Sequence, residues 1–351
     1  MTAVPAVPAD RSATPIETFD ARLPHGITLA CRAAGPVDAP LIVFLHGFPE
    51  AAFAWDAMLR RFGGAYRAVA PNLRGYPGSS TPAEVEAYRP KHLVADVAAL
   101  VAHCNRAAGR APEAPLEALV AHDCGGAVAW NLAAQQPHLL RRLVMLNSPH
   151  PATFLRDLLS SPAQQAASAY MTFLRRPDAA LLLSENDFER LWGFFTRFGA
   201  ADASVPGGGW LTPDVRARYR AAWSAGLEGP LNYYRASPLA PSTPGDASLA
   251  ALKLPAEAVT VRVPTRVVWG LGDTALLPGL LDGLDAFVPD LHVVRVAGAS
   301  HWIVHERPDL VAAEIAQAPD DARRHAHRHR LGRQLQGGER GVARRRRRRS
   351  G

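Results

Sequence analysis

The stretch Leu116–Ala133, LEALVAHDCGGAVAWNLA, predicts a short apolar strand that passes through a tight turn into a helix. Asp123 stands at the turn, with the small residues Ala121, Gly125 and Gly126 around it. This pattern is typical of the nucleophile elbow G-x-S-x-G, where bulky neighbours would clash with the sharply turned backbone. Here Asp replaces Ser, and a carboxylate can attack carbon to leave an ester that water hydrolyses. Asp is also a favoured helix N-cap, so this stretch alone leaves both interpretations open.

Short apolar runs on both sides of this stretch predict the rest of a sheet. Leu41–Leu45 (LIVFL) suits a strand that is buried on both faces of a parallel sheet. Apolar residues at helical spacing predict helices over 52–62, 91–107 and 306–317. Strands and helices alternate from residue 41 onward, which predicts an α/β fold with a doubly wound parallel sheet. The remaining strands are predicted over residues 17–23, 27–33, 67–70, 143–146, 266–269 and 292–296.

The pattern changes after Pro149. Residues 151–245 show helical spacing without a convincing strand, and they hold 13 of the 26 aromatic residues. A segment of this kind inside an α/β pattern indicates an inserted helical cap. The predicted organisation is therefore an α/β core over 16–150 and 246–318, a helical cap over 151–245 and a disordered tail over 319–351.

The composition is that of a globular protein. Of 351 residues, 48% are hydrophobic and 20% are charged. Cys31, Cys104 and Cys124 are widely spaced and lack metal-ligand spacing, so they predict neither disulfides nor a metal site and suit a reducing compartment. Residues 1–15 are rich in Pro and Ala and do not resemble a signal peptide. With no apolar run long enough to span a membrane, the predicted location is the cytoplasm.

The net charge of +7 belongs to the C-terminal tail. Residues 320–351 hold 12 arginines and three acidic residues, whereas the other 319 residues carry 27 basic and 29 acidic residues. Six consecutive arginines would bind polyanions in a salt-dependent way. The interpretation favoured here is a solvated tail or translation past the true stop, and no specific nucleic-acid partner is predicted.

Reactive residues follow four of the predicted strands. They are His46 and the loop to Pro49, Asp123 with Cys124, Asp273, and His301. In open α/β sheets catalytic groups gather beyond the carboxyl ends of the strands. The order nucleophile, acid, histidine is that of the α/β-hydrolases. The four sites together therefore favour Asp123 as a nucleophile over a helix cap.

The chain resembles the epoxide hydrolase branch of the α/β-hydrolase superfamily, whose relatives include the haloalkane and haloacid dehalogenases with an Asp nucleophile. The resemblance runs from about residue 20 to residue 318. It is carried by HGFPE (46–50), NLRGYPGSS (72–80), AHDCGG (121–126), NSPHP (147–151), NYYR (232–235), WGLGD (269–273) and GASHW (298–302).

The resemblance implies roles for five residues. Asp123 would attack an epoxide carbon and form an ester, and His301, oriented by Asp273, would activate the water that hydrolyses it. The backbone N–H groups of Phe48 and Cys124 would form an oxyanion hole. The family also implies a cis peptide before Pro49, and no cofactor or metal.

Opening an epoxide creates an alkoxide that needs a proton, and a phenol can supply it. Tyr234 in NYYR matches one such tyrosine of the family, and Tyr170 resembles the other on a looser local match. Tyr233 is the neighbour that could be mistaken for Tyr234.

Cys124 departs from the family pattern. Epoxide hydrolases and haloalkane dehalogenases usually have Trp after the nucleophile, and fluoroacetate dehalogenases have Arg. A thiol is a poor donor to halide and cannot pair with a carboxylate. The predicted function is therefore hydrolysis of a small apolar epoxide by water. Haloalkane or haloacid dehalogenation is the alternative, and a non-catalytic ligand-binding protein is a further one.

Overall fold

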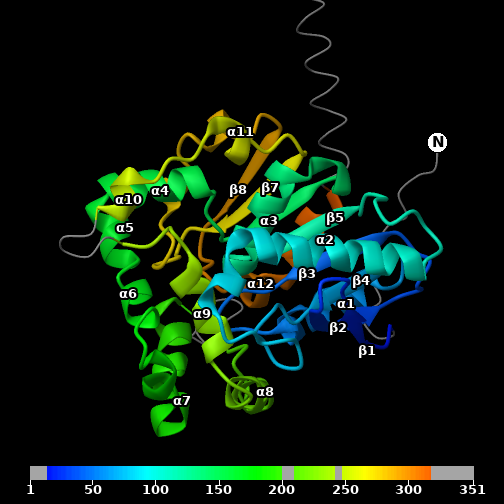
Figure 1. Cartoon of the computed structure of the whole chain (residues 1–351), viewed down its shortest axis with the longest axis horizontal. Coiled ribbons are helices and arrows are strands. Elements are labelled where there is room, and N and C mark those ends of the chain that lie inside the picture. Colours follow the sequence, from blue (N-terminus) through cyan, green and yellow to red (C-terminus); the bar gives the residue numbers. More distant parts are fainter. Residues whose placement is uncertain (1–13, 200–208, 242–246, 318–351) are drawn as a thin grey trace, which may run out of the picture.

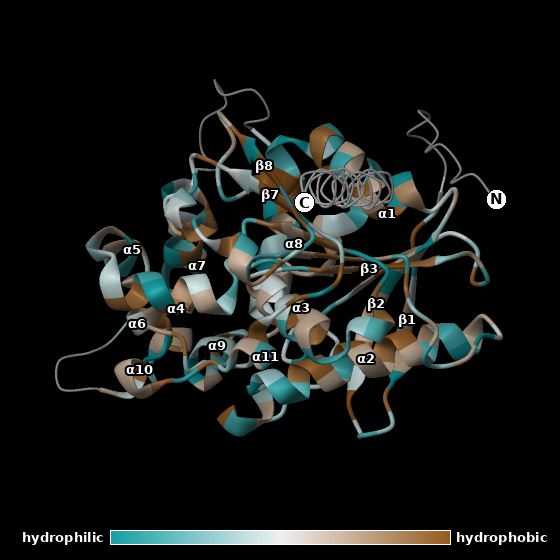
Figure 2. Cartoon of the chain, turned by 90° about the horizontal axis from the view of Figure 1, so that it is seen from above, coloured by the Kyte–Doolittle hydropathy of each residue, from teal (hydrophilic) through white to brown (hydrophobic). Residues whose placement is uncertain are grey.

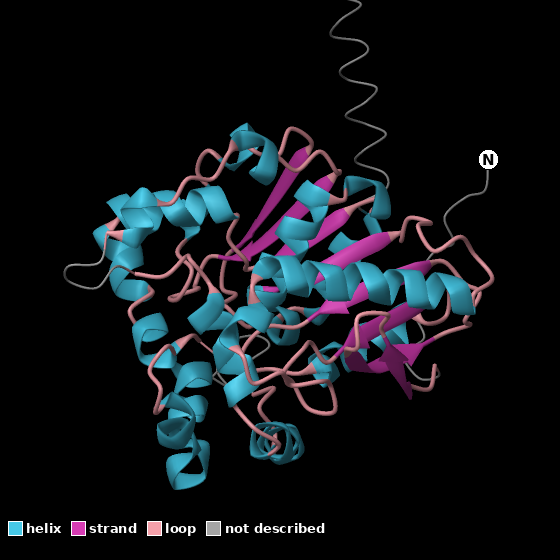
Figure 3. Cartoon of the chain, viewed as in Figure 1, coloured by secondary structure: helices cyan, strands magenta, loops and turns pink. Residues whose placement is uncertain are grey.

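Eight strands form one sheet in the order β1-β2-β4-β3-β5-β6-β7-β8 (Figures 1 and 3). The structure is a computed structural model, and it describes residues 14–199, 209–241 and 247–317. The strands β3 to β8 are parallel, whereas β2 pairs antiparallel with both β1 and β4. The strands are β1 (Glu17–Arg22), β2 (Thr28–Ala34), β3 (Leu41–Leu45), β4 (Arg67–Pro71), β5 (Ala118–His122), β6 (Leu143–Leu146), β7 (Thr265–Gly270) and β8 (Leu291–Val296).

Alternation along the central strands divides the core into two layers. In β3, Leu41, Val43 and Leu45 join one apolar cluster, whereas Ile42 and Phe44 join the other. Successive side chains of a strand point to opposite faces, so an unbroken apolar run serves both layers. Helices α2 and α3 cover one face and α1 covers the other, as the view from above shows (Figure 2).

Helices are the only regular elements between β6 and β7 in the described residues (Figures 1 and 3). The α-helices of that stretch are α4 (Pro151–Ser160), α5 (Pro162–Ala167), α6 (Tyr170–Leu174), α7 (Ala179–Arg197), α8 (Pro213–Ser224), α9 (Glu228–Ala236), α10 (Ser248–Ala251) and α11 (Ala256–Val259). We call α4–α9 the cap helices. Outside this stretch lie α1 (Asp56–Phe62), α2 (Pro90–Ala107), α3 (Asp123–Gln135) and α12 (Ile303–Glu306), and short 3₁₀ turns at Ala52–Trp55, Val85–Tyr88, Pro137–Leu139, Pro278–Leu281 and Leu284–Ala286.

The predicted doubly wound, mostly parallel sheet with an inserted helical cap is confirmed. Two predicted elements were wrong in detail. The helix predicted over 306–317 is two helices, α12 and a second one over 308–317, separated at Arg307. The ring of a proline sterically disfavours the α conformation of the residue before it, and Pro308 follows Arg307. The predicted helix over 52–62 begins as a 3₁₀ turn.

Several predictions concern residues outside the described part of the chain. These are the Pro- and Ala-rich N-terminal residues up to residue 13, the predicted boundary between cap and core at residues 245–246, and the Arg-rich tail over 319–351. In the described ranges, no helix combines the length and the apolar character that crossing a membrane requires.

Candidate active site

Asp123 lies where β5 meets α3, in a sharply turned backbone. Its φ is +48°, a left-handed conformation that costs a non-glycine residue energy. Neighbouring segments leave no room for side chains. A Cβ on Gly125 would lie 2.5 Å from the His46 carbonyl oxygen, and one on Gly126 would lie 2.1 Å from Ser148 Oγ. The small residues around Asp123 are therefore dictated by close approach of β3 and β6.

The predicted acid and histidine lie beside Asp123. His301 Nδ1 is 2.7 Å from Asp273 Oδ2, and His301 Nε2 faces Asp123 Oδ1 at 3.9 Å. The second distance is longer than a hydrogen bond. Asp273 is fixed in turn, because its Oδ1 accepts from the N–H groups of Ala275 and Leu276, each at 2.8 Å. The structure thus brings together three residues that are 28 to 178 positions apart in sequence.

The charges around His301 change its acidity. Burial by itself would lower the pKa of His301, but the attraction of Asp273, its hydrogen bond and the charge of Asp123 together raise the pKa to about 9. The imidazole is therefore protonated at neutral pH.

One predicted oxyanion donor points at Asp123, the predicted nucleophile. The Phe48 N–H donates to Asp123 Oδ2 at 2.9 Å, and the peptide between Phe48 and Pro49 is cis, as expected. Cys124 lies in the first turn of α3, where backbone N–H groups have no acceptor within the helix. The Asp123 carboxylate thus accepts from a residue of another loop, which the helix-cap interpretation does not predict.

Tyr234 and Tyr170 face Asp123 from the cap helices α9 and α6. Both line the same cavity as Asp123, and their ring centroids lie 6.3 Å apart. Burial raises the pKa of both phenols well above 10, so both remain protonated. Tyr233 lines the same cavity, but its hydroxyl is engaged elsewhere, because it donates to the Arg74 carbonyl oxygen at 2.9 Å.

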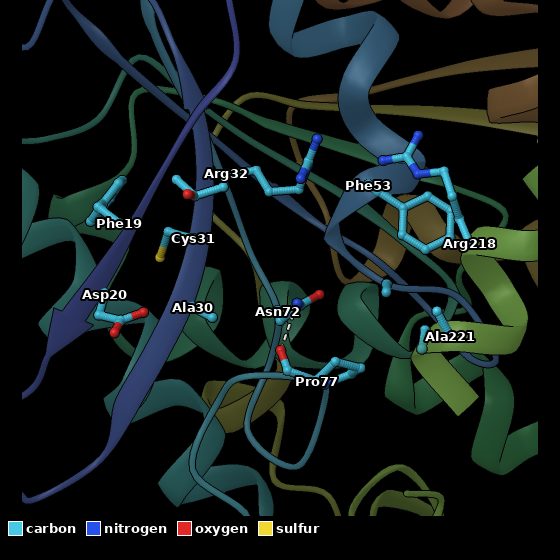
Figure 4. A pocket seen from close by; sticks show the side chains of 13 residues that line it. Phe19, Asp20, Ala30, Cys31, Arg32, Phe53, Asn72, Pro77, Arg218 and Ala221 are labelled. Carbon is cyan, nitrogen blue, oxygen red and sulfur yellow. Dashed lines mark hydrogen bonds between the residues drawn. The ribbon is translucent and has the colours of Figure 1, made fainter. Parts of the chain in front are cut away.

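The cavity that Asp123 lines measures about 190 Å³ and has a predominantly apolar lining. A larger hollow of about 580 Å³ lies elsewhere, between β1, β2 and α8 (Figure 4). Its arginines, Arg32 and Arg218, both bind Asp56, and Asn72 donates to the Pro77 carbonyl oxygen. None of the predicted site residues lines that larger hollow. The candidate active site is therefore the smaller cavity, which Asp123, Tyr170 and Tyr234 line.

Sequence reasoning missed a buried network behind the site. Glu50 accepts from His305 Nε2 at 2.6 Å, from the Tyr219 hydroxyl at 2.8 Å and from His122 Nδ1 at 3.1 Å. The other nitrogen of His122, Nε2, lies 2.9 Å from the His301 carbonyl oxygen. Glu50 stands in the quoted HGFPE motif, but its partners are 72 to 255 positions away and share no pattern with it.

Asn147 is a second residue that the sequence did not single out. Its Nδ2 donates to Asp273 Oδ2 at 2.7 Å, and its Oδ1 accepts from the Gly270 N–H at 2.9 Å. Asn147 therefore fixes the carboxylate that orients His301. Within the described ranges, no group of three or more His, Cys, Asp or Glu side chains is arranged to hold a metal ion.

Comparisons with known proteins agree with this geometry. The family model for the α/β hydrolase fold matches residues 40–308. An AB hydrolase superfamily protein, YfhM of Bacillus subtilis, is 34% identical over 82% of this chain and 92% of its own length. Epoxide hydrolase 4 of Mus musculus is 31% identical over 80% of this chain and 72% of its own length.

Solved structures of epoxide hydrolases are similar as well. One from metagenomes of hot environments is 34% identical, with a TM-score of 0.72 over 86% of this chain and 98% of its own. The epoxide hydrolase of Bacillus megaterium, solved with an inhibitor, is 28% identical, with a TM-score of 0.74 over 87% of this chain and 100% of its own. The chain is therefore a hydrolase of the α/β-hydrolase superfamily and belongs to its epoxide hydrolase branch.

Proposed function

We propose that the protein opens a small apolar epoxide to a vicinal diol through a covalent ester on Asp123. One observation carries the proposal: a carboxylate at a strained turn shares an apolar cavity with two protonated phenols, and a histidine paired with a second carboxylate lies behind it. A phenol pair suits an epoxide because its ring oxygen leaves as an alkoxide.

In the first half of the reaction, an oxygen of Asp123 attacks an epoxide carbon. A new carbon–oxygen bond forms as the ring bond to the epoxide oxygen breaks, and the electron pair goes to that oxygen. Tyr234 and Tyr170 donate hydrogen bonds to it, and one of them gives up its proton. The product is a hydroxyalkyl ester of Asp123.

In the second half, water hydrolyses the ester. His301 takes a proton from water, and the hydroxide oxygen adds to the carboxyl carbon of Asp123. The Phe48 and Cys124 N–H groups hold the resulting oxyanion, a contribution of roughly 3–4 kcal/mol per donor in known sites. The intermediate then expels the diol oxygen, which takes the proton from His301. Asp123 is left as a carboxylic acid and loses its proton to solvent, and the tyrosinate takes a proton from solvent.

The pKa of His301 suits this order of events. Two carboxylates raise it to about 9 before the reaction. Once Asp123 is an ester, one of the two negative charges is gone, so the pKa of His301 falls. The imidazolium can then release its proton to solvent, and the neutral imidazole acts as a base at the step that needs one.

The decisive assay offers the purified protein propylene oxide, octene oxide and a chloroalkane of similar size. We expect diol from an epoxide and no chloride release. Chloride without diol would replace the proposal by dehalogenation, and neither product would favour a non-catalytic binding protein.

We also propose that the protein is cytoplasmic, because its three free cysteines would stay reduced in that compartment.

A further inference from the structure

One face of α3 forms a wall of the catalytic cavity. Cys124, Ala127, Val128 and Asn131 all line it, at positions i, i+3, i+4 and i+7 of the helix. Residues at this spacing share one side of a helix. The wall begins beside Asp123 and extends over about 10 Å, since each helical residue rises roughly 1.5 Å.

This wall leads from the nucleophile to the surface. Val128 is buried, Cys124 and Asn131 are half-buried, and Ala127 is exposed. The other lining residues of the cavity are mostly apolar, among them Pro90, Leu93, Phe154, Met171, Leu239 and Leu254. An apolar chain lying along α3 would therefore contact both buried and solvent-accessible positions of this wall.

The other side of Asp123 is closed by aromatic rings. Tyr170 packs on Phe194 and Phe198 with ring centroids 5.7 and 5.3 Å apart, and Phe198 lies 6.0 Å from the His301 ring. The space next to Asp123 is thus asymmetric, with an open arm along α3 and an aromatic wall towards His301.

Cys124 stands at the entrance to the open arm. Its thiol donates to the Tyr234 hydroxyl oxygen at 3.4 Å, so the side chain reaches the position where the epoxide ring would be held. A thiol is small, and a larger side chain at this position would project into a cavity of only about 190 Å³.

We propose that this face of α3 binds the longer apolar substituent of the substrate and that the small side chain of Cys124 admits it. The substrate class is then an epoxide with one extended apolar arm and little bulk on the other carbon. This inference rests on the proposed function and specifies its substrate.

The test compares octene oxide, whose six-carbon arm would lie along α3, with propylene oxide, which has only a methyl group. In the wild type, kcat/KM should be higher for octene oxide, and stilbene oxide, with a phenyl ring on each carbon, should react poorly. Cys124→Trp should lower the octene-to-propylene ratio of kcat/KM by about tenfold or more. Cys124→Leu gives a smaller obstruction if the Trp variant folds badly.

Two variants serve as controls. Cys124→Ser keeps the size of the side chain and should keep the ratio. Gln135→Trp adds the same ring on α3 four residues beyond Asn131, at an exposed position outside the cavity lining, and should also keep it. An unchanged ratio in both Cys124→Trp and Cys124→Leu would overturn the inference, as would an equal change in Gln135→Trp.

Binding of the products separates this inference from the proposed function. Calorimetry would compare octane diol with propane diol on the wild type and on Cys124→Trp. If no epoxide is turned over, the proposed function fails. A loss of affinity confined to octane diol in Cys124→Trp would still support the arm along α3, and equal affinities in both proteins would overturn it.

Discussion

A substitution at His301 can separate the two halves of the proposed reaction, because His301 acts as a base only in the second half. In His301→Gln, Asp123 can still attack the epoxide, but the base for hydrolysis is gone. We expect diol formation to fall by roughly 10²–10⁴-fold and the intact protein to gain the mass of one epoxide. Mass spectrometry of the intact chain checks this, with the double variant Asp123→Asn, His301→Gln as the control without adduct. Turnover by the wild type with no adduct on His301→Gln would exclude Asp123 as the nucleophile.

Tyr234 and Tyr233 are adjacent phenols with different contacts. Tyr234→Phe removes a proton donor from the cavity, so formation of the ester should slow by about 10²-fold, measured by rapid-quench kinetics. Tyr233→Phe is the matched control. It loses the bond to the Arg74 carbonyl oxygen, which should cost about 1 kcal/mol of unfolding free energy and slow the reaction far less. Equal rate losses in the two variants would contradict the assignment of Tyr234, and not Tyr233, as a proton donor.

The residues that sequence predicted are those with a local signal. Asp123, Asp273 and His301 each follow a predicted strand, and parallel strands bring such ends to one edge of the sheet. Glu50 and Asn147 also lie in quoted motifs, yet their roles depend on which distant groups fold onto them. Glu50 meets Tyr219 only because α8 packs on the core. No periodicity in the sequence encodes that contact.

At the scale of elements, the buried strands were the easiest to predict. Leu41–Leu45 and Leu143–Leu146 were predicted with their observed bounds, because strands buried on both faces are bounded where the apolar run stops. The last helix was wrong because its apolar spacing continues across Pro308, whose effect on Arg307 decides the local backbone. The hydrophobic pattern predicts which face of a helix packs on the core, whereas the effect of proline on the preceding residue decides where the helix is interrupted.

The elbow offers a test of how α3 packs on the sheet. Gly126→Ala would put a Cβ 2.1 Å from Ser148 Oγ and 2.4 Å from Ser148 Cβ, although Ala favours a helix. We expect a loss of about 1–3 kcal/mol in unfolding free energy, the usual cost of overpacking, measured by urea denaturation. Activity should fall too, because Ser148 Oγ donates to the Asp123 carbonyl oxygen at 2.8 Å.

Gly193 in α7 is the matched control for that substitution. A Cβ there would meet no atom within 4 Å. Gly193→Ala should therefore stabilise the protein by about 0.5–1 kcal/mol, the gain of replacing glycine inside a helix. If both variants were equally stable, close approach would not be the reason for a small residue at Gly126.

At the scale of the whole molecule, α8 joins the cap helices to the core. Trp223 Nε1 donates to the Pro49 carbonyl oxygen at 2.7 Å, and Tyr219 donates to Glu50. On the same helix, next to Tyr219, Arg218 binds Asp56 at 2.7 Å (Figure 4 shows Arg218 beside Phe53). The loop that carries Phe48, the proposed oxyanion donor, is thereby held by the same contacts as the cap.

Glu50 lies buried at this contact between α8 and the core, and its charge makes the free energy of unfolding depend on pH. Burial by itself would raise the pKa of the Glu50 carboxyl, but attraction to His305 and the hydrogen bonds of His122 and His305 hold it well below 4.5. A depressed carboxyl pKa stabilises the fold above the unfolded value, and that stability is lost as pH falls below about 4.5. Glu50→Gln should therefore cost about 3–5 kcal/mol at neutral pH, as removal of one partner from a buried ion pair does.

The measurement is urea denaturation of both proteins from about pH 7 down to about pH 3. The stability gap between wild type and Glu50→Gln should be constant above about pH 4.5 and shrink below it. His150, whose burial lowers its pKa to about 4, titrates in both proteins, and Glu50 is not among the causes of its shift, so its contribution cancels in the gap. Tyr219→Phe removes one hydrogen bond and should cost only about 1 kcal/mol, with a much weaker pH dependence. A gap that stayed constant to the lowest pH would mean that the charge on Glu50 contributes nothing, and that shape alone joins the cap to the core.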